Sequence, residues 1–197
     1  MKRLKLFALG ALLALASACT VIAPNVEVYS TLPADAAPRP VQITAASWMD
    51  GNSLAFQQRA SELAALLAAR GYTPGGNGAP LVATYSFETH EPVMRVRTRR
   101  EPVYESHFTE NSDGSTSSDR RLAGYRTVES ETVVFPRIAR LDIIERATGK
   151  KVYEATAHSE SACKNSANII RLLTEALAKD FPNPHEGAVT VSNDTAC

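Results

Sequence analysis

Three arginines at alternate positions, Arg95, Arg97 and Arg99, are the residues of this chain best spaced to do chemistry. In an extended strand, residues two apart point to the same side, so these three guanidinium groups would share one face. Such a row can hold phosphates or carboxylates through paired hydrogen bonds, which makes it a candidate anion-binding or partner-binding site. The alternative is a solvated strand face, in which the arginines pair with glutamates on neighbouring strands: Glu101, Glu105, Glu129 and Glu131.

Sequence motifs that mark common active sites are missing. His90 and His185 are each followed by Glu, but neither has the second His four residues later that a zinc-binding HExxH helix needs. There is no CxxC pair, no P-loop and no GxSxG nucleophile turn. A calcium loop aligned on Gly114 would have Thr109 and Arg120 in place of its first and last acidic ligands. We therefore expect a non-enzymatic protein without a catalytic residue, metal site or cofactor.

The first nineteen residues form an export signal. Basic residues at positions 2, 3 and 5 precede an apolar run from Leu6 to Ala16, which is about eleven residues and too short to span a bilayer. The following Leu-Ala-Ser-Ala-Cys ending resembles the lipobox of bacterial lipoproteins, although Ala16 stands where that motif favours Leu. The resemblance implies cleavage after Ala18 and acylation of Cys19, with several acyl chains giving firm membrane anchoring. Ordinary secretion with the same cleavage is the alternative.

The residue after Cys19 also carries information about location. In lipoproteins of this kind, Asp after the Cys tends to keep the protein in the inner membrane, and here the residue is Thr20. The resemblance therefore implies an outer-membrane protein that faces the periplasm. The whole chain has 21 basic and 21 acidic residues, so removal of the three basic residues of the signal leaves a net charge of −3. This charge argues against nucleic acid as a partner.

Two cysteines remain besides Cys19, namely Cys163 and Cys197. An even pair in an exported domain predicts a disulfide. The bond would close a loop of about 34 residues, which contributes roughly 3–4 kcal/mol in the chain-entropy description. Two separate thiols are the alternative.

The hydrophobic pattern predicts two helices. Residues 54–70 carry a core-facing stripe at Phe56, Ala60, Leu63 and Leu67, with Asn52 or Ser53 as the N-cap and Gly71 at the C-terminal cap. Residues 165–179 form the second helix, which ends before Pro182. Residues 110–119 are polar and predict a hairpin tip. Strands are expected at 41–48, 81–97, 103–108, 125–135, 138–145 and 152–158, with short ones at 26–29 and 189–191.

This order of elements predicts an α+β fold, a largely antiparallel sheet with two helices packed on one face. The predicted organisation is a signal peptide at 1–18, a lipidated N-terminus and Pro/Ala-rich tether at 19–40, and a single α+β domain at 41–197.

Several motifs of the chain resemble a family of envelope lipoproteins called domain of unknown function 4136. They are Trp48 ending an early strand, Ala-Arg-Gly-Tyr at 69–72, Ala-Pro-Leu-Val-Ala-Thr-Tyr at 79–85, Arg-Leu-Asp-Ile-Ile at 140–144, Thr-Gly-Lys-Lys-Val-Tyr at 148–153 and Asp-Phe-Pro at 180–182. The resemblance implies no particular reaction. We expect an accessory or assembly subunit that binds another envelope protein or an anionic glycan. The alternatives are a glycan- or small-ligand-binding module and a hydrolase with an unmarked site.

Overall fold

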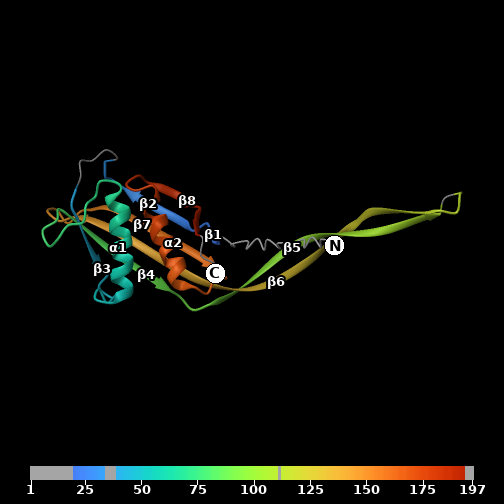
Figure 1. Ribbon diagram of the computed structural model, residues 1–197, viewed down its shortest axis with the longest axis horizontal. Helices are drawn as coiled ribbons and strands as arrows, with labels where there is room; N and C mark the ends of the chain where they lie inside the picture. The colour runs from blue at the N-terminus through green and yellow to red at the C-terminus, as the bar shows by residue number, and fades with distance from the viewer. Residues whose placement is uncertain (1–19, 34–38, 111, 194–197) are drawn as a thin grey trace, which may run out of the picture.

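The computed structural model describes residues 20–33, 39–110 and 112–193, which form a domain with a long projecting β-hairpin (Figure 1). The strands and helices, in chain order, are β1 (Thr20–Ile22), β2 (Asn25–Ser30), β3 (Val41–Ala45), α1 (Leu54–Ala68), β4 (Leu81–Thr89), β5 (Val93–Glu110), β6 (Thr116–Glu145), β7 (Lys151–Ser161), α2 (Ser166–Lys179), β8 (His185–Ala188) and β9 (Val191–Asn193).

The larger sheet of the described residues runs in the order β3-β4-β6-β7-β2-β8, and β5 pairs with the outer part of β6. The α+β class is confirmed, but the prediction of a largely antiparallel sheet needs correction because the sheet is mixed. β3 and β4 are parallel, with Val41 beside Leu81 and Ala45 beside Tyr85. The chain passes from β3 to its parallel neighbour β4 through α1, whereas the antiparallel strands β6 and β7 are joined by a short turn at 146–150.

The N-terminal boundary of the domain also needs correction. Residues 25–30, placed within the predicted tether at 19–40, form β2, which lies between β7 and β8 in the sheet. Val26 and Val28 are buried because alternate residues of this strand face the core. The short strand expected at 26–29 is therefore an interior strand of the domain, and the domain begins well before residue 41.

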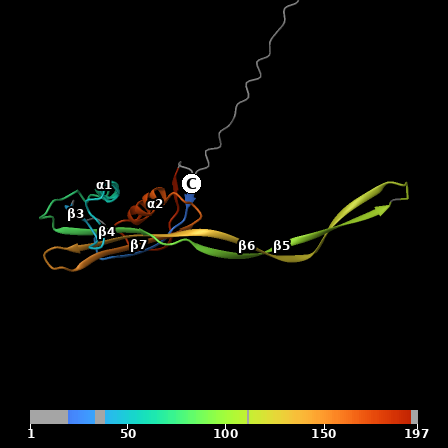
Figure 2. The same ribbon diagram turned by 90° about the horizontal axis from the view of Figure 1, so that it is seen from below.

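Alternation along the strands creates one apolar face of the sheet. Leu81, Ala83 and Tyr85 of β4 are fully buried, as are Leu141 and Ile143 of β6. Figure 2 shows α1 and α2 on the same side of the sheet. The α2 residues Ile169, Leu173 and Leu177 are buried in the same cluster as these strand residues. The opposite face carries exposed ion pairs, including Arg140 with Glu88 at 2.6 Å and Lys151 with Asp142 at 3.1 Å.

The caps of α1 follow the predicted chemistry. Ser53 Oγ accepts a hydrogen bond of 3.2 Å from the backbone N–H of Phe56, which satisfies one of the free donors of the first turn. Gly71 has a φ of +84°, the left-handed conformation that glycine adopts most easily. Phe56, Leu63 and Leu67 are buried as their spacing predicts.

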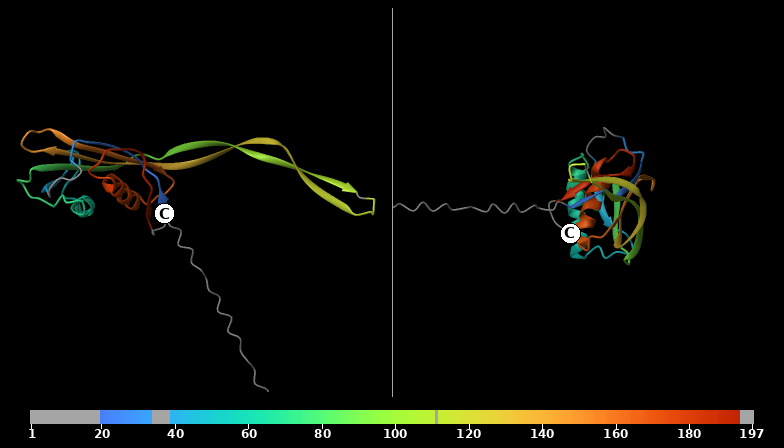
Figure 3. Two further views of the ribbon diagram at one scale, coloured as in Figure 1. Left: turned by 90° about the horizontal axis from the view of Figure 1, so that it is seen from above. Right: turned by 90° about the vertical axis from the view of Figure 1, so that its right-hand side faces the viewer.

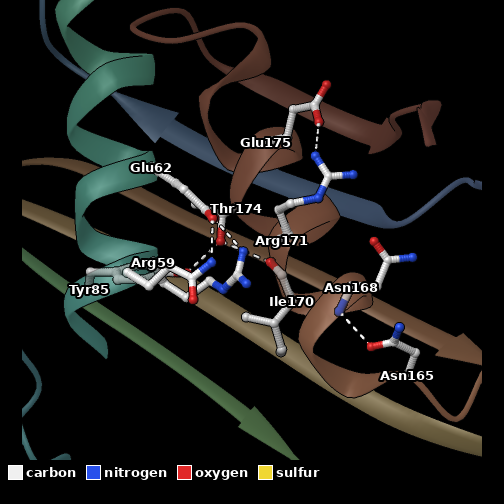
Figure 4. A network of polar contacts seen from close by, with 10 residues as sticks. Arg59, Glu62, Tyr85, Asn165, Asn168, Ile170, Arg171, Thr174 and Glu175 are labelled. Atoms are coloured by element: carbon white, nitrogen blue, oxygen red, sulfur yellow. Dashed lines mark hydrogen bonds and ion pairs between the residues drawn. The ribbon is translucent and has the colours of Figure 1, made fainter. Parts of the chain in front are cut away.

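A polar network connects the sheet to α2 (Figure 4). The Tyr85 hydroxyl contacts Thr174 Oγ1, and Thr174 donates in turn to the carbonyl of Ile170 at 2.9 Å. Because the Thr174 proton is used there, Tyr85 is the donor to Thr174. Burial raises the pKa of Tyr85 to about 12. A second tyrosine, Tyr153, donates to the carbonyl of Leu177 at 3.0 Å and fixes β7 to α2 in the same way.

The projecting hairpin consists of β5 and the part of β6 before the sheet. β6 pairs with β7 from Phe135 onward and with β4 from Arg137 onward. Residues 93–134, called the arm from here, therefore extend beyond the sheet, and Figure 3 shows the two strands twisting along their length. A bulge interrupts the pairing between Val103 and Tyr104, because Val103 pairs with Gly124 whereas Tyr104 pairs with Leu122. The sequence predicted several shorter strands here, whereas the structure has one continuous ribbon.

Candidate partner-binding site on the arm

The arm has two chemically different faces. In an antiparallel pair, residues directly opposite each other point to the same side. Arg95, Arg97 and Arg99 lie opposite Thr132, Ser130 and Val128, so all three arginines belong to one side of the arm. We call this side the arginine face.

Arg95 is joined to the domain by an ion pair with Glu160 at the end of β7. Its Nε and one Nη donate to the two carboxylate oxygens at 2.9 and 2.6 Å. The hydrogen bonds from Arg95 hold the pKa of Glu160 below its ordinary value. The same hydrogen bonds raise the pKa of Arg95. The charge of Arg95 is therefore largely used within the chain.

Arg99 is also engaged within the chain. It pairs with Glu101, and Arg126 donates to the other carboxylate oxygen of Glu101 at 3.1 Å. Hydrogen bonding from Arg126, together with the charges of both arginines, lowers the pKa of Glu101. One carboxylate thus serves two guanidinium groups, which leaves an excess of positive charge at this level of the arm.

Arg97 lies between these two pairs, and its side chain has no ion-pair partner among the described residues. It borders two hollows at the root of the arm. The larger hollow, of about 400 Å³, is lined by Ile22, Ala23, Asn25, Arg97, His158, Ser159, Glu160 and Ser161. The smaller, of about 260 Å³, is lined by Arg95, Arg97, Thr132, Val134, Glu160 and Ala162. Arg97 is therefore the arginine of the row best placed to meet an external anionic group.

Two of the four predicted acidic partners of the row, Glu101 and Glu105, lie on the arginine face, and the other two do not. Glu101 is a partner, but Glu129 and Glu131 lie opposite Thr98 and Val96, on the other side of the ribbon. Glu160, which the sequence analysis did not single out, is the partner of Arg95 instead. Strand alternation could assign the faces of β6, but no sequence signal placed the end of β7 beside β5.

The other side of the arm exposes large apolar side chains, and we call it the apolar face. By strand register, it includes Met94, Val96, Tyr104, Phe108, Leu122, Tyr125 and Val133, each exposed by at least half. Two arginines of this face lie over its tyrosines, Arg100 at 5.7 Å from the Tyr125 ring and Arg120 at 5.4 Å from the Tyr104 ring. Aromatic residues and arginine are the side chains enriched in protein interfaces.

The predicted cysteine sites are only partly described. Cys19 and Cys197 lie outside the described residues, so the acylation of Cys19 and the Cys163–Cys197 disulfide stay predictions. Cys163 is buried, and its carbonyl accepts a hydrogen bond of 2.8 Å from the buried Arg137. Arg137 also donates to Ser166 and to the carbonyl of Phe135. These contacts fix the point where the arm joins the sheet.

A further apolar groove of about 390 Å³ lies between α1 and α2, lined by Glu62, Ala65, Leu66, Ala69, Arg171, Thr174 and Glu175. Among the described residues, no group of three or more His, Cys, Asp or Glu side chains could hold a metal ion. In the same part of the chain, no helix has the length and apolar character needed to cross a membrane.

Comparisons with known proteins give structural likeness alone. No protein-family model and no curated protein matches the chain. A PDZ domain protein from Parabacteroides distasonis is similar at 12% identity and a TM-score of 0.48, covering 87% of this chain, which spans 38% of that one. Two crystal forms of a PelC dodecamer from Paraburkholderia phytofirmans have 14% and 15% identity and TM-scores of 0.42 and 0.43. They cover 79% of this chain and 92% and 93% of their own.

Proposed function

We propose that this protein is a non-enzymatic outer-membrane lipoprotein that binds another envelope component in the periplasm through the arginine face of its arm. The observation that carries the proposal is Arg97, which borders two hollows while Arg95 and Arg99 are held by carboxylates of the same chain. A guanidinium group with free donors forms paired hydrogen bonds with carboxylate or phosphate groups. The expected ligand is therefore an acidic side chain of a partner protein.

The internal ion pairs support this role because they hold the arm in place. Arg95 and Glu160 join β5 to β7, and Arg137 joins the start of the arm to the segment before α2. Binding costs less entropy when the binding surface is already ordered. We also infer that both helices pack on one face of the sheet, which leaves the polar face and the arm open to a partner.

The lipid anchor would raise the local concentration of the protein near membrane partners. Ile22, Ala23 and Asn25 line the larger hollow and follow Cys19 by three to six residues. An extended chain of three residues spans at most about 10 Å, so an anchored Cys19 would keep Ile22 close to the membrane surface. Tethering of this kind strengthens a weak contact without adding a new one.

An anionic glycan is the second candidate ligand, and one observation favours it. The larger hollow combines Arg97 with Asn25, His158 and Ser161, which offer several donors to hydroxyl and carboxylate groups of a sugar. This lining is more polar than the apolar groove between the helices. Both candidate ligands would bind the guanidinium group of Arg97, so one crosslinking experiment at this site distinguishes a glycan from a protein partner.

The test is site-specific crosslinking in intact cells. A photo-crosslinking amino acid replaces Ser130, the exposed residue opposite Arg97, in one strain and Gln57, an exposed residue of α1, in the control strain, so that the Arg97 guanidinium group is kept. We expect one envelope protein to be captured from position 130 and absent from position 57. Capture of polysaccharide alone would favour the glycan, and equal products from both positions would contradict the proposal. Metabolic labelling with a fatty acid, lost in Cys19→Ser, tests the anchor separately.

A further inference from the structure

The apolar face of the arm has no cover among the described residues. Phe108 is 73% exposed, Met94 62% and Tyr125 60%, and these side chains follow one another along a single side of the ribbon. Exposed apolar patches of this extent mark interaction sites in soluble domains. The arginine face on the other side of the same ribbon is free for a different partner.

We propose that a second copy of this chain covers the apolar face, with the two arms stacked face to face and antiparallel. The two-fold axis crosses the ribbon at the Pro102–Tyr125 pair. This pair lies midway between Met94–Val133 at the root and Glu110–Thr116 near the tip. The proposal goes beyond the envelope partner proposed above, because it concerns the opposite face of the arm.

The register of β5 and β6 makes this arrangement complementary in charge. A two-fold axis in this position sets β5 over β5 and β6 over β6 of the second copy. The root of each arm then lies at the tip of the other. Glu129, opposite Thr98, then faces Arg120 of the second copy, which is opposite Ser106. Glu129 and Glu131 of the face lie toward the root and its arginines toward the middle and the tip, whereas Glu110 lies at the tip and faces Met94 of the second copy. Antiparallel stacking therefore joins Glu129 to Arg120 twice.

The same axis matches apolar and aromatic residues. Val96 faces Phe108 of the second copy, and Arg100 faces Tyr104, a second cation–π partner for an arginine that already lies over Tyr125. At the axis, Tyr125 meets Tyr125. These contacts follow from strand alternation alone and involve residues that are exposed in the single chain.

Parallel stacking is excluded by the shape of the molecule. By alternation along β6, the apolar face continues into the face of the sheet that carries Ala139, Leu141 and Ile143, on the side where the helices lie (Figure 2). Two parallel arms would place both domains at the same end of the dimer, with their helix layers facing each other across the contact. In the antiparallel arrangement the tip of one arm ends level with the root of the other, and the two domains lie at opposite ends.

The available area is large enough for a stable contact. The arm from Met94 to Glu110 spans about 55 Å at about 3.3 Å per residue, and a two-stranded ribbon is about 10 Å wide. Stacking would bury about 1,100 Å² in total, above the roughly 1,000 Å² of a specific interface. Both ribbons twist with the same hand, so the two faces stay in contact when the ribbons coil around each other.

The first test is a disulfide crosslink at the axis. In cells that express the full chain, Tyr125→Cys should form a covalent dimer on a non-reducing gel, since both copies of residue 125 meet. Arg126→Cys, one residue away on the arginine face, is the matched control and should give no more dimer than the unmodified chain. Absence of dimer from Tyr125→Cys, or equal dimer from both variants, would overturn the proposal.

The second test reverses charges. In the mature protein purified in detergent, Arg120→Glu and Glu129→Arg should each weaken dimerisation at least tenfold in sedimentation analysis, and the double variant should restore it. A monomeric wild-type protein, or a double variant as weak as the singles, would contradict the arrangement. A partner captured at position 130 without any Tyr125→Cys dimer would sink this inference and leave the proposed function standing.

Discussion

Arg95 of the arm and Glu160 of β7 are joined by two parallel hydrogen bonds of 2.9 and 2.6 Å, although 65 residues separate them in the sequence. The pair is the polar contact that connects the arm to the domain on the arginine face. On the opposite side of the sheet, the fully buried Arg137 of β6 also connects the arm to the domain, through a hydrogen bond to the carbonyl of Cys163. The root of the arm is thus fixed from both sides.

Glu160→Gln should loosen the root of the arm without unfolding the domain. The neutral amide keeps the shape of the side chain but loses the charge-assisted hydrogen bonds from Arg95. Hydrogen exchange should become faster in residues 93–97, while the melting temperature stays unchanged. Glu101→Gln, which removes a pair farther along the arm, is the control and should leave the root unchanged. Equal exchange in wild type and Glu160→Gln would contradict this role.

The same pair should persist over a wide range of pH. The pKa of Glu160 is lowered in the folded protein, so its stabilising contribution is complete above the ordinary pKa of a glutamate. It is lost when the pH falls through the lowered folded-state value. The protection factors of the root amides, which correct for the pH dependence of intrinsic exchange, should therefore be constant around neutral pH and fall in acid, and Glu160→Gln should show no such acid-dependent step.

Arg137→Ala should destabilise the domain by about 2–4 kcal/mol, because it leaves a cavity and removes hydrogen bonds from the carbonyls of Phe135 and Cys163. Arg140→Ala is the matched control on the same strand. Arg140 is exposed on the opposite face and pairs with Glu88, so its loss should cost below about 1 kcal/mol. Urea unfolding measures both, and similar values for the two variants would contradict the structural role of Arg137.

The fold was predictable where the chemistry is local. Ser53, Gly71 and the spacing of Phe56, Leu63 and Leu67 define α1 from sequence, because caps and helical periodicity act over a few residues. The parallel pairing of β3 with β4 was not predictable in the same way. Alternation shows which side of a strand is buried, but not which strand lies beside it or in which direction.

The arm and its site were predictable in part. The common face of Arg95, Arg97 and Arg99 followed from period-two alternation, but the contact of Arg95 with Glu160 depends on distant pairing of β6 with β7. Pro102 and Pro136 are normally signs of strand ends, and both lie inside long strands here. Because the sequence analysis ended strands near these prolines, it divided one continuous ribbon into several short strands.

Stability should fall in alkaline solution through Tyr85. Burial raises its pKa from 10.0 to about 12, so the folded state holds the phenolic proton more tightly than the unfolded state. The contribution, on the order of 2–3 kcal/mol, is complete below pH 10 and is lost as the pH rises toward 12. Tyr85→Phe should lose less stability between pH 9 and pH 11.5, about 1–2 kcal/mol less in urea unfolding. Tyr29→Phe, at an exposed tyrosine, should match the wild type.

The cysteine prediction can be checked by intact mass. If Cys163 and Cys197 form a disulfide, alkylation of the denatured mature protein without reductant should add no label to either residue. Alkylation after reduction should label both. Label on both residues before reduction would end the disulfide prediction. In that case Cys163→Ser would remove no constraint from the unfolded chain, and it would change the free energy of unfolding only because residue 163 is buried.

The position of β2 sets an order of events for the folding of this chain. β2 leaves the ribosome early, yet both of its neighbours, β7 and β8, come from the last quarter of the sequence, as in the hydrogen bond from Thr31 to Val152, 121 residues away. Pairings this distant close slowly, since a long loop must form first. Val26 and Val28 therefore stay without their strand partners until nearly the whole chain has been synthesised. During that time this chain has more need of chaperones than a protein whose first strands pair with each other.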